Sequence, residues 1–357
     1  MIEPVKKQNI SGSQSKPLPP KLDGNVPIGN CAQAISQEGP TQITSSNALG
    51  KYRGCLLGLA VGDALGTTLE FSHPGTFEPI KDIVGGGPFE LEAGQWTDDT
   101  SMALCLADSL IQCKGFNPQD QLERYLLWYE KGYMSSNGSC FDIGSTTLSA
   151  LEHFKHIKKW PYCGSPFSAP TNGSIMRLAP VPMYYAKRPL EAIQKAALSS
   201  QTTHGSTRSI DACRYLSALI VGALNNASKE QLLSDHFSPI EDLWKEEPLT
   251  PQIDEIASGS FKYLEPPKIC GSGLAMRSLE AALWAFYKSN SFSEGALLAV
   301  NLGNDADTTG AVYGQLAGAF YGVEGIPSHW LAKIYNKDLI KSFATKIYEQ
   351  SCVSKEA

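Results

Sequence analysis

Residues 210–224 have the sequence IDACRYLSALIVGAL. A helix built from this stretch carries apolar side chains over most of its circumference, which is typical of a helix surrounded by other helices. Apolar residues at helical spacing recur on both sides of it, over residues 101–113, 121–129, 146–157, 190–198, 275–287 and 311–321. Candidate strands such as residues 80–84 are too few and too short to form a sheet. We therefore predict an all-α fold, a single large, compact domain of orthogonal helices.

The ends of the chain differ in composition from this helical part. Residues 1–47 are rich in Ser, Pro, Gln, Asn and Gly and show no sustained periodicity, so we predict a flexible N-terminal arm. Such an arm is either a disordered leader or a segment that becomes ordered on a partner. The helical domain is predicted to span residues 48–352, followed by a C-terminal tail at residues 353–357.

The overall charge excludes several classes of partner. Thirty basic and 36 acidic residues give a net charge of −6, so no basic surface for nucleic acid or an anionic membrane is expected. The longest early apolar stretch, residues 56–61, is too short to cross a bilayer. None of the nine cysteines forms a C-x-x-C pair, so we predict reduced thiols. The first residues, MIEPVKKQNISGSQ, lack the apolar region of a signal peptide, so we predict a cytoplasmic protein.

Two acidic clusters stand at expected helix starts. Residues 94–101 read GQWTDDTS and residues 303–310 read GNDADTTG. Carboxylate and hydroxyl oxygens are the ligands that Mg²⁺, Ca²⁺ or Mn²⁺ select. The alternative for the first cluster is an ordinary helix N-cap, whereas the second cluster contains more acids than a single cap needs. Two such clusters brought together would repel each other unless cations lay between them, which favours a binuclear metal site.

Four further motifs contain polar residues among small ones. Residues 58–66 (GLAVGDALG), followed by Glu70, fit either a functional acid or close helix packing. Residues 142–147 (DIGSTT) place an acid at a helix start. In residues 172–180 (NGSIMRLAP), Ser174 is predicted to begin a helix suited to binding phosphate. His204 is a lone histidine, which is more often a structural hydrogen-bonding group than a catalyst.

Taken in order, these six elements resemble the ADP-ribosylglycohydrolase family over residues 52–321. The resemblance implies a pair of divalent ions, Mg²⁺ or Mn²⁺, held by Thr97, Asp98, Asp99, Asp305, Asp307 and Thr308. It also implies an ADP-ribose cleft formed by Gly144, Ser145, Gly173, Ser174, Met176 and His204. The Asp-Ile-Gly form at residues 142–144 looks more like the members that act on ADP-ribosyl-arginine than those that act on ADP-ribosyl-serine.

The predicted function is hydrolysis of the bond between ADP-ribose and an arginine side chain of a modified protein, which reverses an ADP-ribosyltransferase. Asp142 is predicted to transfer the proton and Glu70 to act on the metal side, although the two roles can be exchanged. The alternative is an immunity protein whose arm blocks a cognate ADP-ribosyltransferase toxin, and both functions can coexist. A pseudoenzyme that only binds ADP-ribose is disfavoured, because every acid of the two clusters is present.

Overall fold

The computed structural model describes residues 41–157 and 161–353 of the chain. Within these ranges the regular structure is helical, apart from two isolated bridges that pair Gly86 with Leu91 and Thr171 with Leu274. The elements are α1 (Thr41–Gly66), η1 (Thr67–Leu69), α2 (Asp98–Cys113), α3 (Pro118–Lys131), α4 (Ser145–Ile157), α5 (Pro180–Tyr184), α6 (Pro189–Gln201), α7 (Thr207–Leu224), α8 (Lys229–Leu232), α9 (Leu243–Glu246), α10 (Pro251–Ala257), η2 (Ser260–Lys262), α11 (Ala275–Lys288), α12 (Phe292–Val300), α13 (Ala306–Tyr321), η3 (Val323–Gly325), α14 (Ser328–Lys333) and α15 (Lys337–Cys352). The predicted all-α fold is confirmed.

Each helical stripe predicted from the sequence lies on a helix. The predicted elements match α2, α3, α4, α6, α7, α11 and α13. Helix α1 begins at Thr41, ahead of the predicted boundary at residue 48. The rest of the predicted arm and residues 354–357 of the predicted tail lie outside the described residues. None of the helices in the described ranges is both long and apolar enough to span a membrane.

One local prediction is wrong: Ser174 does not begin a helix. Residues 172–177 form turns, and α5 starts later, at Pro180. The side-chain amide of Gln315, on α13, donates hydrogen bonds to the carbonyls of Ile175 (3.2 Å) and Met176 (2.7 Å). In a continuing helix these carbonyls would accept from the N–H groups of residues 179 and 180, but the Ala179 N–H donates to Gln315 Oε1 at 2.7 Å and Pro180 has no N–H.

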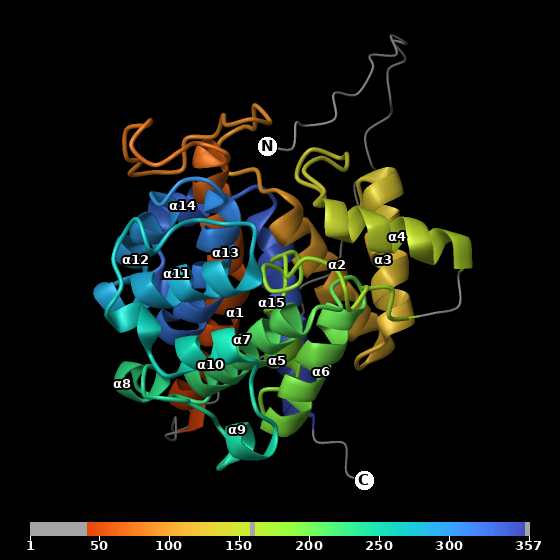
Figure 1. Cartoon of the computed structure of the whole chain (residues 1–357), viewed down its shortest axis with the longest axis vertical. Helices are drawn as coiled ribbons and strands as arrows, with labels where there is room; N and C mark the ends of the chain where they lie inside the picture. Colours follow the sequence, from red (N-terminus) through yellow and green to blue (C-terminus); the bar gives the residue numbers. More distant parts are fainter. Residues whose placement is uncertain (1–40, 158–160, 354–357) are drawn as a thin grey trace, which may run out of the picture. The chain divides into compact units, whose positions relative to one another are not determined.

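The centre of the fold is a seam of small residues between α1 and α13, which run antiparallel and side by side (Figure 1). A Cβ on Gly62 would lie 2.0 Å from the carbonyl oxygen of Gly310, so the two backbones are in direct contact. The same close approach repeats every four residues, pairing Gly54 with Gly318, Gly58 with Gly314, and Gly66 with Ala306. The seam therefore fixes the end of α1 beside the start of α13.

Helix α7 forms a second part of the core. It is buried at nearly every position from Ser209 to Leu224 and packs against α5, α6, α11 and α13. Helix α1 is tied to it by Lys51, whose buried ammonium donates a hydrogen bond to the carbonyl of Ala223 at 2.8 Å. The apolar stretch at residues 210–224 is thus a central helix, as its pattern predicted.

We predict that Gly62→Ala disrupts the seam. The added methyl group meets backbone 2.0 Å away, so the helices must separate, and we expect a loss of about 3 kcal/mol in the free energy of unfolding. Denaturant unfolding measures this loss. Gly144→Ala is the matched control, because a Cβ at Gly144 meets nothing within 4 Å. Equal stability of the two variants would contradict the role of the seam.

Candidate active site

Asp63, near the end of α1, caps the start of α2. Its carboxylate accepts hydrogen bonds from the backbone N–H groups of Thr97 (2.9 Å) and Thr100 (3.0 Å). It also accepts from the hydroxyls of the same two residues, at 3.0 and 2.6 Å. The N-cap Thr97 makes no side-chain cap bond of its own. The capping of α2 thus comes from another helix, which leaves Asp98 and Asp99 without this structural task.

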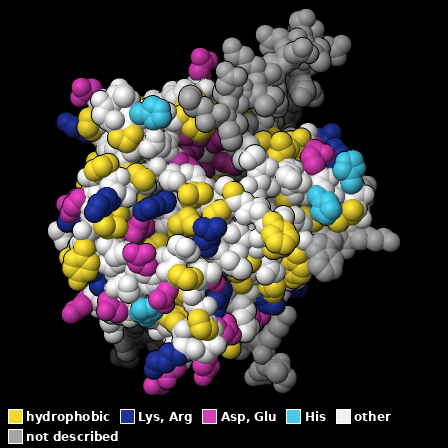
Figure 2. Space-filling view, viewed as in Figure 1, with side chains coloured by type: hydrophobic (Ala, Val, Ile, Leu, Met, Phe, Trp, Pro, Cys, Tyr) yellow, Lys and Arg dark blue, Asp and Glu magenta, His cyan; other side chains and the backbone are white. Residues whose placement is uncertain are grey.

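The two acidic clusters meet at the end of the seam. Carboxylate oxygens of Asp63, Asp99 and Asp307 lie within 4.8 Å of one another, and so do those of Glu70, Asp142 and Asp307. Asp307 belongs to both triads. The space-filling view shows acidic side chains gathered in a hollow in the upper part of this face (Figure 2). Two adjacent sets of oxygen ligands around a shared carboxylate fit two divalent cations.

Several buried carboxylate oxygens in the triads lack a full set of hydrogen-bond donors. The hydroxyl of Thr97 lies 3.0 Å from Asp63, 3.1 Å from Asp99 and 3.3 Å from Asp307, but its single proton can serve only one of these acceptors at a time. Asp99 Oδ1 and Glu70 Oε2 are buried with no hydrogen-bond partner. Buried carboxylate oxygens of this kind are normally paired or bound to a metal, so the donor set fits cations.

The electrostatics of the site follow from this crowding. Burial raises the pKa of Glu70, Asp98, Asp99 and Asp307 well above the ordinary range, and repulsion from neighbouring carboxylates raises it further. Burial, together with the charges of Asp305 and Asp63, raises the pKa of Asp142 to about 7. Burial raises that of Asp63 to about 6, against the opposing effect of its hydrogen bonds. Without cations, the site therefore holds protons at neutral pH.

The remaining predicted metal ligands lie beside the triads. Asp305 is half-buried and belongs to neither triad, and its Oδ2 accepts a hydrogen bond from the side-chain amide of Asn172 at 2.8 Å. It stands at the N-cap of α13 but makes no cap bond. Asp98 also lies outside both triads, and Thr308 is buried in the first turn of α13. Neither N-cap residue, Thr97 or Asp305, makes a side-chain cap bond, so the N-cap alternative does not hold for the first acidic cluster.

Three segments predicted to bind ADP-ribose come together beside α4. A Cβ on Gly173 would lie 2.8 Å from the ring of His204 and 3.1 Å from the hydroxyl of Thr147, in α4. Gly144 and Ser145 are exposed at the start of the same helix. His204 is fully buried, hydrogen-bonded to the Thr203 hydroxyl at 2.7 Å, and burial holds its pKa well below the ordinary value, so the imidazole is neutral.

Ser174 and Met176 have almost fully buried side chains. The Ser174 hydroxyl accepts hydrogen bonds from Ser200 (2.9 Å) and from the thiol of Cys213 (3.4 Å). These contacts hold the turn at residues 172–177 against α6 and α7. The two side chains are therefore part of the packing beneath the turn.

Arg177 is a site residue that the sequence analysis did not assign. Its fully buried guanidinium donates hydrogen bonds to the Gly173 carbonyl at 2.9 Å and to the Thr203 hydroxyl at 2.6 Å. It also lies over the ring of Tyr125, 4.5 Å from the ring centroid. Arg177 thus ties the turn at Gly173 to the segment that carries His204. A basic residue inside the apolar run 175–181 is the signal that could have identified it.

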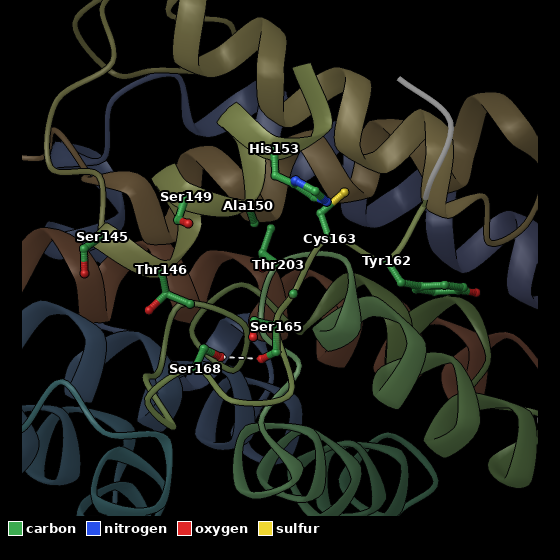
Figure 3. Close-up of a pocket in the computed structure, with 11 residues that line it drawn as sticks. Ser145, Thr146, Ser149, Ala150, His153, Tyr162, Cys163, Ser165, Ser168 and Thr203 are labelled. Carbon is green, nitrogen blue, oxygen red and sulfur yellow. Dashed lines mark hydrogen bonds between the residues drawn. The ribbon is translucent and has the colours of Figure 1, made fainter. Parts of the chain in front are cut away.

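A cavity of about 590 Å³ opens next to these residues (Figure 3). Its walls come from α4, from the loop at residues 162–168 and from Thr203, with Ser145, Ser149 and His153 on the helical side. Ser145 and Thr203 connect it to the segments described above, because Ser145 follows Gly144 and Thr203 precedes His204. A mixed polar and aromatic lining of this size suits a nucleotide-sized ligand.

The described residues thus combine an all-α domain with two carboxylate triads that could hold metal ions, and with a separate polar cavity beside α4. The sequence model of the family described as ADP-ribosylglycohydrolase matches residues 44–357. The chain belongs to the ADP-ribosylglycohydrolase family, which confirms the resemblance noted in its motifs. It is accordingly an enzyme that hydrolyses glycosyl bonds.

Similar proteins agree with this assignment. The chain is 38% identical over 349 residues to ADP-ribosylarginine hydrolase Tri1 of Pseudomonas putida (strain GB-1), covering 96% of this chain and 91% of the relative. It is 38% identical over 333 residues to the protein of the same name from Serratia proteamaculans (strain 568), covering 93% and 88%. A solved structure titled ADP-ribosylglycohydrolase-related protein complex has a TM-score of 0.76 and 41% identity, covering 86% of this chain and 99% of that one.

We predict that the ion-free protein loses stability as the pH rises from about 5 to about 8. The pKa of Asp142 is about 7 in the folded protein, against about 4 for an unfolded aspartate, so between these values the folded state binds more protons. Stability then falls with rising pH. Thermal unfolding in a chelator and in Mg²⁺ measures this, and Mg²⁺ should raise the melting temperature more at pH 8 than at pH 5. An equal effect of Mg²⁺ at both pH values would contradict it.

Proposed function

We propose that this chain is a metal-dependent hydrolase that removes ADP-ribose from arginine side chains of modified proteins. The observation that carries the proposal is the pair of carboxylate triads sharing Asp307, in a family member 38% identical to proteins named ADP-ribosylarginine hydrolase. The substrate is an ADP-ribosylated protein and the product is free ADP-ribose. The reaction reverses that of an ADP-ribosyltransferase.

The proposed cofactors are two Mg²⁺ or Mn²⁺ ions. Their ligands are Thr97, Asp98, Asp99, Asp305, Asp307 and Thr308, and the buried, unpartnered oxygens described above support oxygen coordination. Asp63 lies in a triad with Asp99 and Asp307 and is therefore a further candidate ligand. Its carboxylate, however, already accepts four hydrogen bonds. We therefore assign Asp63 a positioning role. Bound divalent ions would act as Lewis acids that lower the pKa of a bound water. They would also orient the ribose hydroxyls.

Proton transfer is assigned to the Glu70 and Asp142 pair. Their carboxylate oxygens lie within 4.8 Å of each other, so repulsion between the two negative charges opposes simultaneous ionisation in the ion-free site. In the ion-free site the pKa of Asp142 is raised to about 7, so this carboxyl can hold a proton near physiological pH. We assign the proton transfer at the reacting sugar to Asp142. Glu70 then serves the metal side, and its buried, unpartnered Oε2 is consistent with that role.

The ADP-ribose is proposed to occupy the region between the triads and the cavity beside α4. Gly144 and Ser145 stand at the start of α4, where free backbone N–H groups favour an anionic group such as a diphosphate. Gly173 and the neutral His204 form the adjoining wall, while Ser174 and Met176 support it from below. The cavity of about 590 Å³ has room for the nucleoside part.

A linkage assay tests this function. We expect rapid release of ADP-ribose from ADP-ribosyl-arginine proteins and slow or no release from ADP-ribosyl-serine proteins, in both cases measured with Mg²⁺ and with a chelator. Activity should depend on the added ion. A preference for serine linkages, or full activity in the chelator, would refute the proposal.

The variant Asp307→Asn tests the proposed metal ligands. Because Asp307 is shared by both triads, its loss should reduce kcat/KM at least about a hundredfold and remove both ions from a calorimetric titration with Mg²⁺. Asp254→Asn is the control, since Asp254 is exposed and pairs with His236 away from α1 and α13. An Asp307→Asn protein that binds two ions and turns over normally would contradict the assignment.

A second candidate function is inhibition of a cognate ADP-ribosyltransferase toxin by the N-terminal arm. The specific observation is that the alignment with the Pseudomonas putida relative covers 96% of the chain, whereas the family match starts at residue 44. The similarity to that relative therefore extends into residues 1–43, beyond what the family shares. This segment would bind by shape and hydrogen bonding, because its few charges nearly cancel.

Deletion of residues 1–40 tests the arm and leaves helix α1 complete. We expect the shortened protein to retain hydrolysis of ADP-ribosyl-arginine but to lose binding and inhibition of a cognate transferase. Pull-down and transferase inhibition assays compare it with the full chain. Equal binding and equal inhibition by both proteins would exclude this role of the arm.

A further inference from the structure

Three phenylalanine rings form a row whose two outer members are sequence neighbours of the carboxylates assigned to proton transfer. Phe71 directly follows Glu70 and Phe141 directly precedes Asp142. Phe89 lies between them, with its ring centroid 6.4 Å from that of Phe71 and 5.3 Å from that of Phe141. We call these three residues the aromatic row. Its two ends are thus carried by the backbone next to the two proposed proton-transfer residues.

Phe71 is exposed in a conformation that costs free energy. Its side chain is 64% exposed, and its backbone has φ of 60°, in the left-handed region that bulky residues rarely adopt. The Phe71 N–H donates to the carbonyl of Asn304 at 2.6 Å, and the Asn304 N–H donates to that of Ser72 at 2.7 Å. These reciprocal bonds hold the ring next to the acidic cluster that starts α13. Backbone strain maintained around an exposed aromatic ring is typical of a ligand-binding position.

The loop that carries Phe89 is equally fixed. A Cβ on Gly87 would lie 2.2 Å from the carbonyl of Thr67, so this loop packs directly on η1, just before Glu70. Phe89 and Phe141 are only partly buried. The row therefore exposes aromatic faces to solvent. Backbone contacts fix the position of the segments that carry Phe71 and Phe89.

We propose that the aromatic row receives the guanidinium of ADP-ribosyl-arginine and so determines the preference for arginine linkages. This inference rests on the proposed function. An N-glycosylated guanidinium remains planar and positively charged, and such a group stacks on aromatic faces and is attracted to nearby carboxylates. A serine linkage offers neither a charge nor a plane. Phe71, the most exposed ring, is the principal contact, and Phe89 and Phe141 keep it in place.

Phe71→Leu, Phe71→Tyr and a Tyr263→Leu control test the row. With Phe71→Leu we expect KM for ADP-ribosyl-arginine to rise about tenfold, the size of a cation–π contact, while the Kd of free ADP-ribose with Mg²⁺ stays unchanged. Phe71→Tyr keeps an aromatic face and should retain the wild-type KM. Tyr263 is 86% exposed and has no part in the site, so Tyr263→Leu should behave as wild type.

The outcomes separate this inference from the function on which it rests. If the wild-type protein fails to cleave ADP-ribosyl-arginine, the proposed function itself is refuted. If the wild type cleaves it and Phe71→Leu leaves KM unchanged, the row has no recognition role. An equal rise in KM and in the Kd of free ADP-ribose, or a Phe71→Tyr variant as impaired as Phe71→Leu, also overturns the inference, because each indicates a general disturbance of the site.

Discussion

Backbone contact between α1 and α13 is the constraint on which the rest of this structure depends. Glycine at every fourth position removes the side chains that would hold the helix axes 8–10 Å apart, so main-chain atoms meet directly. The end of α1 and the start of α13 are fixed by this contact. Asp63 and Asp307 approach each other because the helices that carry them cannot separate.

The contact between α1 and α13 brings several carboxylates together in a buried site. Carboxylates at such short distances repel each other, and the surrounding residues oppose this by hydrogen bonding rather than by charge. Asp63 is held by the start of α2, and Asp305 is held by the amide of Asn172. The fully buried guanidinium of Arg177 donates its hydrogen bond to the Gly173 carbonyl and not to a carboxylate of the triads. The centre thus keeps its attraction for external cations.

The sequence predicted what is local and missed what depends on distant partners. Helical periodicity and oxygen-ligand chemistry are local properties, so the helices, the two acidic clusters and the start of α4 could be predicted. The capping of α2 by Asp63 could not, because the residues involved are 34 and 37 positions apart. Ser174 was wrongly assigned to a helix start because Gln315, a distant residue of α13, takes the Ala179 N–H and bonds the carbonyls of the turn.

The pairing of α1 with α13 also has a kinetic consequence. Gly66 and Ala306 are in contact although 240 positions separate them in the sequence, so the seam has a very high contact order. During synthesis, the first half of the chain can form α1 and α2, but Asp307 reaches them only once most of the chain has been made. A partly synthesised chain therefore lacks the shared carboxylate of both triads, and assembly of the centre is among the last events of folding.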